Sequence, residues 1–248
     1  MASRDDLYSR PEDRIEPFEF NRSVAHVFDD MAERSIPHYR EVQRMIATLV
    51  RTFYQPGTAL YDLGCSTGTT LVLSARSLEE WGVSDYHLVG MDSSGPMCEE
   101  AKEKLLREGL GERNIEVIRR DITDAEFLNP SVVILNYTLQ FVRPLERERL
   151  ISRIYHSLSH NGVLLVSDKT LQSHTDISRC FIDNYYAFKR GNGYSELEIS
   201  RKREALENVL IPYRIKEEEN LFRQCGFEAV DILFSWFNFT SFLCMKKD

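Results

Sequence analysis

Residues 59–68 read Ala59-Leu-Tyr-Asp-Leu-Gly-Cys-Ser-Thr-Gly68. The apolar residues before Gly64 make a short run that is typical of a buried strand. Gly64 lets the chain turn sharply, and Gly68 lets the next helix come close, leaving main-chain N–H groups free to face a ligand. We therefore expect a strand, a tight turn and a helix that runs through about Glu80. A nucleotide-type site and an ordinary strand-to-helix turn both fit this pattern.

The same alternation continues along the chain. Further apolar, strand-like runs follow at 87–92, 115–121, 132–136 and 163–166. A helical stretch from Leu145 to Leu158 ends at Asn161-Gly162. Helices that alternate with nearly continuous apolar strands indicate a parallel sheet with helices on both faces.

Both ends of the chain depart from this alternation. Apolar stripes at 24–31 and 39–53 predict two helices before Pro56-Gly57. Near the C-terminus, strand-like runs at 227–234 and 239–245 flank a short turn at 235–238. This pair predicts an antiparallel hairpin added to the sheet edge.

An insertion at 171–214 lies between the fifth strand and the hairpin, with a turn at 191–193. Its first helix carries Phe181, Tyr185 and Phe188, and its second opens at Ser195, where Ser195 and Glu198 have the spacing of a capping box. Glu198 and Lys202 are spaced to pair on that second helix.

We expect a single α/β domain over residues 1–248. It comprises an N-terminal helical extension (1–55), core strands one to five (56–170), the helical insertion (171–214), and a C-terminal helix and hairpin (215–248). Six parallel strands and one antiparallel strand are, by analogy, the Rossmann-like sheet of class I S-adenosyl-L-methionine (SAM) enzymes, in which ligands bind at the carboxyl ends of the strands.

Composition limits the function. The 248 residues include 31 Lys and Arg against 39 Asp and Glu, a net charge of −8, which argues against direct nucleic-acid binding. The apolar-leaning run at 132–142 is too short to span a membrane, and residues 1–14 lack the apolar core of a secretory signal. Five scattered cysteines without a C-x-x-C pair suggest a reducing cytoplasm.

The strand ends supply candidate ligand contacts. Asp92 lies twenty-four residues after Gly68, where a carboxylate can accept hydrogen bonds from ribose hydroxyls, although Ser93 and Ser94 after it also suit a helix cap. Asp121 and Ile122 are then expected to flank an adenine ring, and Asn136 to face the same crevice.

NAD fits the turn and Asp92 as well. No second nucleotide-binding unit or hydride-transfer constellation follows, however, and we expect no metal because the six histidines lack ligand spacing. The segment Asn136-Tyr-Thr-Leu139 also departs from the Asn/Asp-Pro-Pro-aromatic motif of many amine methyltransferases, and no general base stands out.

Longer motifs resemble one family. The chain is similar to the carboxy-S-adenosyl-L-methionine synthase family over nearly its whole length, through Ser35-Ile-Pro-His-Tyr39, Tyr61-Asp-Leu-Gly-Cys-Ser66, Leu135-Asn-Tyr-Thr-Leu-Gln-Phe141 and Phe188-Lys-Arg-Gly-Asn-Gly-Tyr-Ser-Glu-Leu-Glu-Ile-Ser-Arg-Lys-Arg203. The resemblance implies conversion of SAM and prephenate to carboxy-SAM and phenylpyruvate, for wobble-uridine modification of tRNA by a downstream carboxymethyltransferase. It also implies the ligand residues Tyr39, Gly64, Cys65, Ser66, Asp92, Ser93, Asp121, Ile122, Asn136 and Arg203.

Arg203 has the clearest chemical rationale. Beside a sulfonium alone it would gain nothing, but its guanidinium fork can bind an added carboxylate. Pairing with Glu207 on an exposed helix face is the alternative interpretation. For Tyr39 the alternatives are a core or lid role and a hydroxyl contact, and Cys65 is expected to bind through its backbone amide only.

Other functions remain open at this stage. A methyltransferase for a small or RNA acceptor would release S-adenosylhomocysteine without prephenate, and a non-catalytic SAM-binding partner would leave prephenate unchanged. Departures from the family pattern stand at Thr67, Arg143, Asp168, Lys169 and Gly191. The apolar N-terminal helices and the aromatic-rich insertion suggest a homodimer interface.

Overall fold

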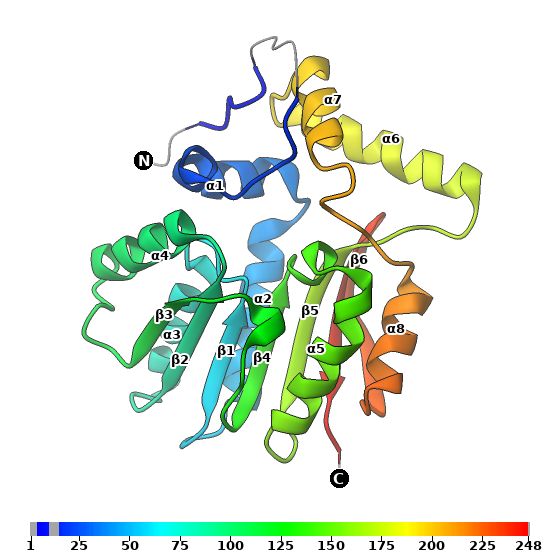
Figure 1. Cartoon of the computed structure of the whole chain (residues 1–248). Helices are drawn as coiled ribbons and strands as arrows, with labels where there is room; N and C mark the ends of the chain where they lie inside the picture. Colours follow the sequence, from blue (N-terminus) through cyan, green and yellow to red (C-terminus); the bar gives the residue numbers. More distant parts are fainter. Residues whose placement is uncertain (1–3, 10–14, 248) are drawn as a thin grey trace.

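The computed structural model describes residues 4–9 and 15–247, so part of the charged stretch 1–14 lies outside the described residues. Within these ranges the chain forms a seven-stranded sheet of order β3-β2-β1-β4-β5-β7-β6 (Figure 1). The strands are β1 (Ala59–Leu63), β2 (His87–Asp92), β3 (Ile115–Arg119), β4 (Pro130–Asn136), β5 (Val163–Lys169), β6 (Ala229–Trp236) and β7 (Phe239–Met245).

Strand direction confirms the predicted architecture. Strands β1 to β5 pair in parallel, whereas β7 pairs antiparallel with both β5 and β6. Only β7 therefore opposes the other described strands. The predicted hairpin turn was too long, because Trp236 still pairs with Phe239 and the reversal is confined to Phe237, whose φ is 46°, and Asn238.

The helices are α1 (Arg22–Ser35), α2 (Tyr39–Phe53), α3 (Thr69–Glu80), α4 (Gly95–Arg107), α5 (Pro144–Ser157), α6 (Thr175–Gly191), α7 (Glu196–Ala205) and α8 (Ile215–Gln224). Short 3-10 helices follow β3 (Ile122–Asp124) and β4 (Leu139–Phe141). Neighbouring residues of β4 face opposite sides of the sheet: Ile134 packs in the cluster that includes α2 and α3, and Val133 in the one that includes α5 and α8. This two-sided burial explains the nearly continuous apolar sequence.

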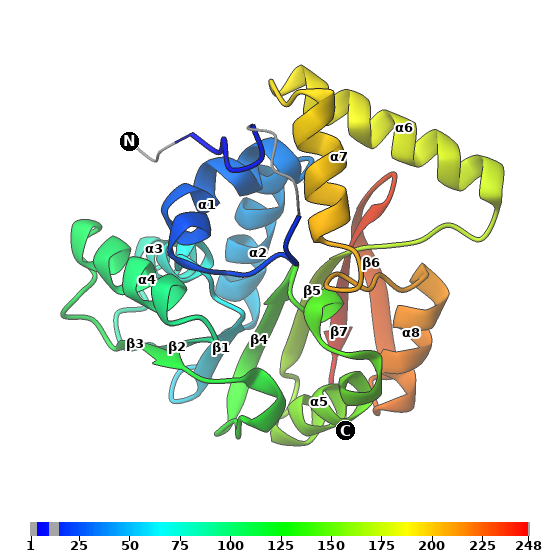
Figure 2. The same ribbon diagram turned by 45° about the horizontal axis from the view of Figure 1, so that its top comes forward.

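Three helices lie beyond the carboxyl ends of the strands. Figures 1 and 2 show α1, α6 and α7 above this edge of the sheet. Val24, Val27 and Met31 of α1 pack in one cluster with Met97 of α4 and Ala205 of α7. The N-terminal extension and the insertion, far apart in sequence, thus meet over the same edge.

The beginning of α7 confirms the predicted capping box, since Ser195 and Glu198 exchange hydrogen bonds between side chain and backbone. The predicted Glu198–Lys202 pair was wrong. Lys202 is buried and turns instead toward Ser35 and Asp5. Across the described ranges, no helix combines the length and apolar character needed to cross a membrane.

Candidate functional site

A cavity of about 420 Å³ opens at the carboxyl edge of the sheet, a size typical of small-molecule sites. Residues that follow five adjacent strands contribute to its wall, together with side chains from α1, α2, α6 and α7. The wall brings together nine of the ten predicted ligand residues: Tyr39, Gly64, Cys65, Ser66, Asp92, Ser93, Asp121, Ile122 and Asn136.

Arg203 is the exception, since its side chain is exposed and is not part of the cavity wall. Successive residues of an α-helix point about 100° apart, because each turn takes about 3.6 residues. On α7, it is the side chain of Lys202 that points inward and lines the cavity. In this single chain Arg203 therefore does not serve the cavity beside it.

The backbone amides of the loop after β1 donate to the end of β2. The amides of Gly64 and Cys65 donate to the Met91 carbonyl oxygen at 2.7 and 3.0 Å, and the Ser66 amide donates to Asp92 Oδ2 at 3.0 Å. Our expectation that these N–H groups face a ligand was wrong, because β2 already satisfies them. A dinucleotide pyrophosphate requires such amides, whereas SAM carries no phosphate. The loop therefore favours SAM over NAD.

Gly64 has the expected role, whereas Gly68 allows a close approach of α4 rather than of α3, the next helix along the chain. Gly64 has φ +77°, and a Cβ there would overlap the Thr138 side chain. Gly68 has φ +80°, and a Cβ there would lie 3.1 Å from the Cβ of Ala101 on α4. Both positions thus require glycine for conformation and for close approach.

Asp92 joins two loops beside the cavity. Its Oδ1 accepts from the Ser94 amide at 2.8 Å, while the Ser94 hydroxyl caps α4 by accepting from the Met97 amide at 3.2 Å. Burial raises the pKa of Asp92 above its ordinary value. A carboxylate oxygen can accept more than one hydrogen bond, so this anchoring role is compatible with ribose binding.

Asp121 both caps a helix and lines the cavity. Its Oδ1 accepts from the amide and the hydroxyl of Thr123 at 2.8 and 2.7 Å, which caps the 3-10 helix after β3. The adjacent Ile122 is buried and also lines the cavity. The structure therefore brings both residues to the cavity wall, and their contact with an adenine ring stays a prediction.

Cys65 is held as a neutral thiol. Burial, followed by the charges of Asp62 and Asp92, raises its pKa well above the ordinary value. A thiolate nucleophile is thus disfavoured at this position. Because the Cys65 amide donates to Met91, its predicted contact through the backbone is not available in this conformation.

Sequence reasoning missed the aromatic wall around Asn136. Tyr137 adopts φ 60°, a left-handed conformation that is uncommon for an aromatic residue and that often marks a functional site. Its ring centroid lies 6.3 Å from that of Tyr39, whose hydroxyl accepts from Gln43 Nε2 at 2.9 Å. The amide of Tyr137 donates to the Ser167 carbonyl oxygen at 2.6 Å, which fixes the turn.

Three lysines in the cavity wall were also missed as site residues: Lys169 at the end of β5, Lys189 on α6 and Lys202 on α7. Burial lowers the pKa values of Lys169 and Lys202 to about 8 and that of Lys189 well below its ordinary value. The sequence did contain a signal for Lys189. It follows Phe181 and Tyr185 at intervals of four residues, which places the lysine on the apolar face of its helix.

Comparison with known proteins decides the family. A carboxy-S-adenosyl-L-methionine synthase from Desulfotalea psychrophila is 45% identical over 243 residues, covering 98% of this chain and 97% of that protein. One of the same name from Methylococcus capsulatus is 43% identical over 245 residues, covering 98% and 100%. The chain belongs to the carboxy-S-adenosyl-L-methionine synthase family. The family described as "Methyltransferase domain" also matches, at residues 60–162.

Solved structures confirm the class I SAM-methyltransferase fold that this synthase family shares. A SAM-dependent methyltransferase structure from Methanococcus maripaludis aligns with a TM-score of 0.62 at 16% identity, covering 96% of this chain and 98% of that one. An O-methyltransferase family protein from Burkholderia thailandensis aligns with a TM-score of 0.65 at 16% identity, covering 95% and 66%.

The cavity suits the ligand of the synthase family. Asn136 Oδ1, in the cavity wall, is a buried acceptor that lacks a hydrogen-bond partner in the described part of the chain, and so is Asp62 Oδ2, although Asp62 is not part of that wall. Burial and the charge of Asp92 raise the pKa of Asp62 to about 7. The cationic amino group and sulfonium of SAM complement such acceptors. Among residues 4–9 and 15–247, no cluster of three or more His, Cys, Asp or Glu side chains could hold a metal ion.

Proposed function

We propose that this chain converts SAM and prephenate to carboxy-SAM and phenylpyruvate. The observation that carries the proposal is the similarity of nearly the whole chain to proteins named carboxy-S-adenosyl-L-methionine synthase. The cavity supports it, because the residues that this family resemblance implies gather on one wall.

The reaction balances without a metal or an external oxidant. Prephenate breaks the bond to its ring carboxylate and releases CO2 and hydroxide as its ring becomes aromatic. The hydroxide removes a proton from the SAM methyl group and becomes water. The resulting sulfonium ylide forms a carbon–carbon bond to CO2. In this scheme the protein orients both substrates and excludes solvent water, so proximity is its main contribution.

The order of the strands supports a position for each part of SAM. Asp121, Asp92 and the loop at Gly64 follow the adjacent strands β3, β2 and β1, a suitable frame for adenine, ribose and the sulfonium. Asn136 follows β4, next in the sheet, and supplies an acceptor for the amino acid part. The ligand then lies across the crevice from β3 toward β4.

We propose that Arg203 acts on a neighbouring copy of this chain. The side chain is exposed and lies outside the wall of its own cavity. Ile177, Ile182 and Leu197, on the same pair of helices, are large exposed apolar residues, a pattern that favours a homodimer. In such a dimer the guanidinium would bind the carboxylate added to SAM.

We further propose that the product is made in the cytoplasm and passed to a carboxymethyltransferase that modifies the wobble uridine of tRNA. The net charge of −8 supports transfer of a small molecule rather than binding of tRNA by this chain.

An enzymatic assay tests the proposed function. The protein is incubated with prephenate, with and without SAM, and phenylpyruvate is measured over time. The expected result is phenylpyruvate formation that depends on SAM, with one carboxy-SAM formed for each phenylpyruvate. S-adenosylhomocysteine formation without use of prephenate would favour a methyltransferase. SAM binding with no turnover of either compound would favour a binding partner.

A further inference from the structure

Most charged residues of the cavity wall lie toward its two ends, apart from Arg143 and Glu146, one of each sign, at the start of α5. Asp92 and Asp121 lie at the ends of β2 and β3. Lys169 lies at the end of β5, on the other side of β1 and β4, and Lys189 and Lys202 face the cavity from the insertion. The acidic side suits the cationic groups of SAM, and the single carboxylate of SAM does not account for three lysines on the other side.

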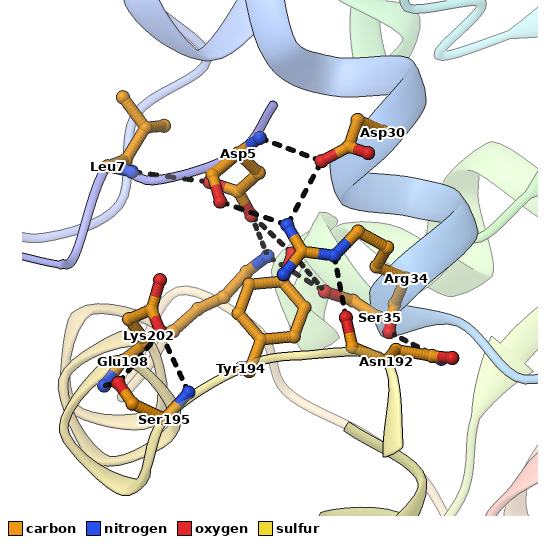
Figure 3. Close-up of polar contacts among 10 residues, drawn as sticks. All are labelled: Asp5, Leu7, Asp30, Arg34, Ser35, Asn192, Tyr194, Ser195, Glu198 and Lys202. Carbon is orange, nitrogen blue, oxygen red and sulfur yellow. Dashed lines mark hydrogen bonds and ion pairs between the residues drawn. The ribbon is translucent and has the colours of Figure 1, made fainter. Parts of the chain in front are cut away.

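One of the three lysines already has a counter-charge. Figure 3 shows Lys202 pointing at Asp5 and Ser35, with Nζ 3.5 Å from Asp5 Oδ2 and 3.0 Å from Ser35 Oγ. Asp5 is itself fixed, because its carboxylate accepts from the Tyr194 hydroxyl and its amide donates to Asp30 Oδ2 at 2.7 Å. Lys202 is therefore part of an internal ion pair.

The other two lysines differ. In the described part of the chain, neither Lys169 nor Lys189 forms an ion pair with a carboxylate. Both ammonium groups face the ring of Tyr185, with Nζ 4.9 and 5.0 Å from its centroid. A ring face compensates a buried cation only partly, and Lys189 is 95% buried.

The surroundings of Lys189 make its charge still less favourable. Burial lowers its pKa most, and the positive charges of Lys202 and Lys169 lower it further, with Asp5 opposing them. Arg34 adds another cation to this region, over the ring of Tyr194 at 4.1 Å. An anion bound between the lysines would relieve this repulsion and complete their hydrogen bonds.

We propose that Lys169 and Lys189 form the subsite that binds the carboxylates of the second substrate, a dicarboxylate. This inference rests on the proposed function and deepens it, because prephenate carries two carboxylates, whereas SAM carries one. Tyr39, Tyr137 and Tyr185 line the same cavity and give the ring of the substrate an apolar, aromatic surface.

The test compares Lys169→Met and Lys189→Met with Arg190→Met. Methionine keeps the length of the side chain and removes the charge. Arg190 is the matched control, because it follows Lys189 on the same helix but is exposed and pairs with Glu196 at 2.9 Å. Steady-state rates give KM for prephenate at saturating SAM, and calorimetry gives the affinity for SAM.

We expect each lysine variant to raise KM for prephenate about 10-fold or more, because each variant loses one charge-assisted hydrogen bond to the substrate. The affinity for SAM should stay within about twofold of the wild-type value. Arg190→Met should change neither value. An unchanged KM in both lysine variants overturns the inference, and so does a fall in kcat alone, which would indicate a proton-transfer role.

A binding measurement separates this inference from the proposed function. Protein saturated with S-adenosylhomocysteine, which has no methyl group to react, is titrated with prephenate. If wild-type protein binds prephenate and the lysine variants do not, the subsite stands even when the turnover assay fails. If wild-type turnover is observed but all variants bind prephenate equally, the proposed function stands and the subsite is refuted.

Discussion

At the scale of single residues, the cavity lysines carry a cost in stability that can be measured. The folded-state pKa of Lys169, about 8, lies below the ordinary lysine value of about 10.4. Between these pH values the unfolded chain binds more protons than the folded chain, so this group makes stability rise with pH. Below pH 8 its full unfavourable contribution is present.

We predict that Lys169→Met is more stable than the wild type at pH 7, by on the order of 1 kcal/mol, because it removes a buried charge without a carboxylate partner. The advantage should shrink as pH rises from about 8 to about 10.4, where the wild-type lysine is neutral in both states. Denaturant unfolding of both proteins at several pH values gives this difference. A variant that is less stable at pH 7 would contradict the account.

Two glycines with positive φ allow the stability cost of backbone strain to be separated from that of steric overlap. Gly64 and Gly109 both have positive φ, at +77° and +71°, but only a Cβ at Gly64 would meet neighbouring atoms. We predict that Gly109→Ala costs about 1 kcal/mol of stability and Gly64→Ala about 2 kcal/mol more. Gly64→Ala should also weaken SAM binding, since Thr138 must move. Equal losses of stability in a thermal unfolding experiment would refute the predicted clash.

At the scale of elements, the buried pair of Asp5 and Lys202 joins the N-terminal segment to α7. The side chains of Lys202 and Asp5 are 7% and 2% exposed, so removing one charge leaves the other buried and unpaired. We predict that Asp5→Asn destabilises the protein by about 3 kcal/mol. Relative to the wild type, hydrogen exchange in the Asp5→Asn variant should become faster in α7 and change less in α5.

The matched control for Asp5→Asn is Glu99→Gln. The Arg22–Glu99 pair has a shorter distance of 2.7 Å but is exposed, at 79% and 58%. Exposed pairs contribute little, so Glu99→Gln should change stability by less than about 0.5 kcal/mol. Similar effects of the two substitutions would show that burial does not determine the strength of these pairs.

The element scale also shows what the sequence could predict. The apolar runs located the strands, because residues buried on both faces of a sheet leave a continuous pattern. The end of β6 was misplaced, since Trp236 continues the pairing with Phe239 beyond the apolar run. The role of Lys202 was missed because its partner Asp5 is 197 positions away in the chain, and local spacing pointed to Glu198 instead.

In the candidate site, too, local patterns predicted some residues and missed those that depend on tertiary packing. Strand ends can be read from local patterns, so Asp92, Asp121 and Asn136 were placed at one edge before the fold was known. Lys169 and Lys189 meet at Tyr185 only through the packing of α6 against the sheet. The outward direction of Arg203 likewise depends on which face of α7 is buried, and its role stays a prediction.

At the scale of the whole molecule, the proposed dimer predicts complementation between inactive variants. Arg203→Ala leaves the cavity intact but removes the guanidinium, and Asp92→Ala damages the cavity but keeps the guanidinium. If Arg203 serves the neighbouring copy, mixed dimers contain one complete site and recover activity. If it serves its own chain, mixing restores nothing. Analytical ultracentrifugation of each variant checks that dimers form.

The division of residues 1–248 into four segments of one domain also stays a prediction. The packing of α1 and α7 in one cluster supports cooperative unfolding of the extension with the insertion. A second transition in calorimetry that belongs to the insertion alone would argue against a single domain.

The central claim is that the carbon added to SAM comes from prephenate. It is tested most directly with prephenate labelled with carbon-13 in its ring carboxylate, incubated with SAM and the purified protein. The account predicts a product whose mass exceeds that of SAM by one labelled carboxyl group in place of a hydrogen, formed together with unlabelled phenylpyruvate. A product that lacks the label, or release of S-adenosylhomocysteine alone, would contradict it.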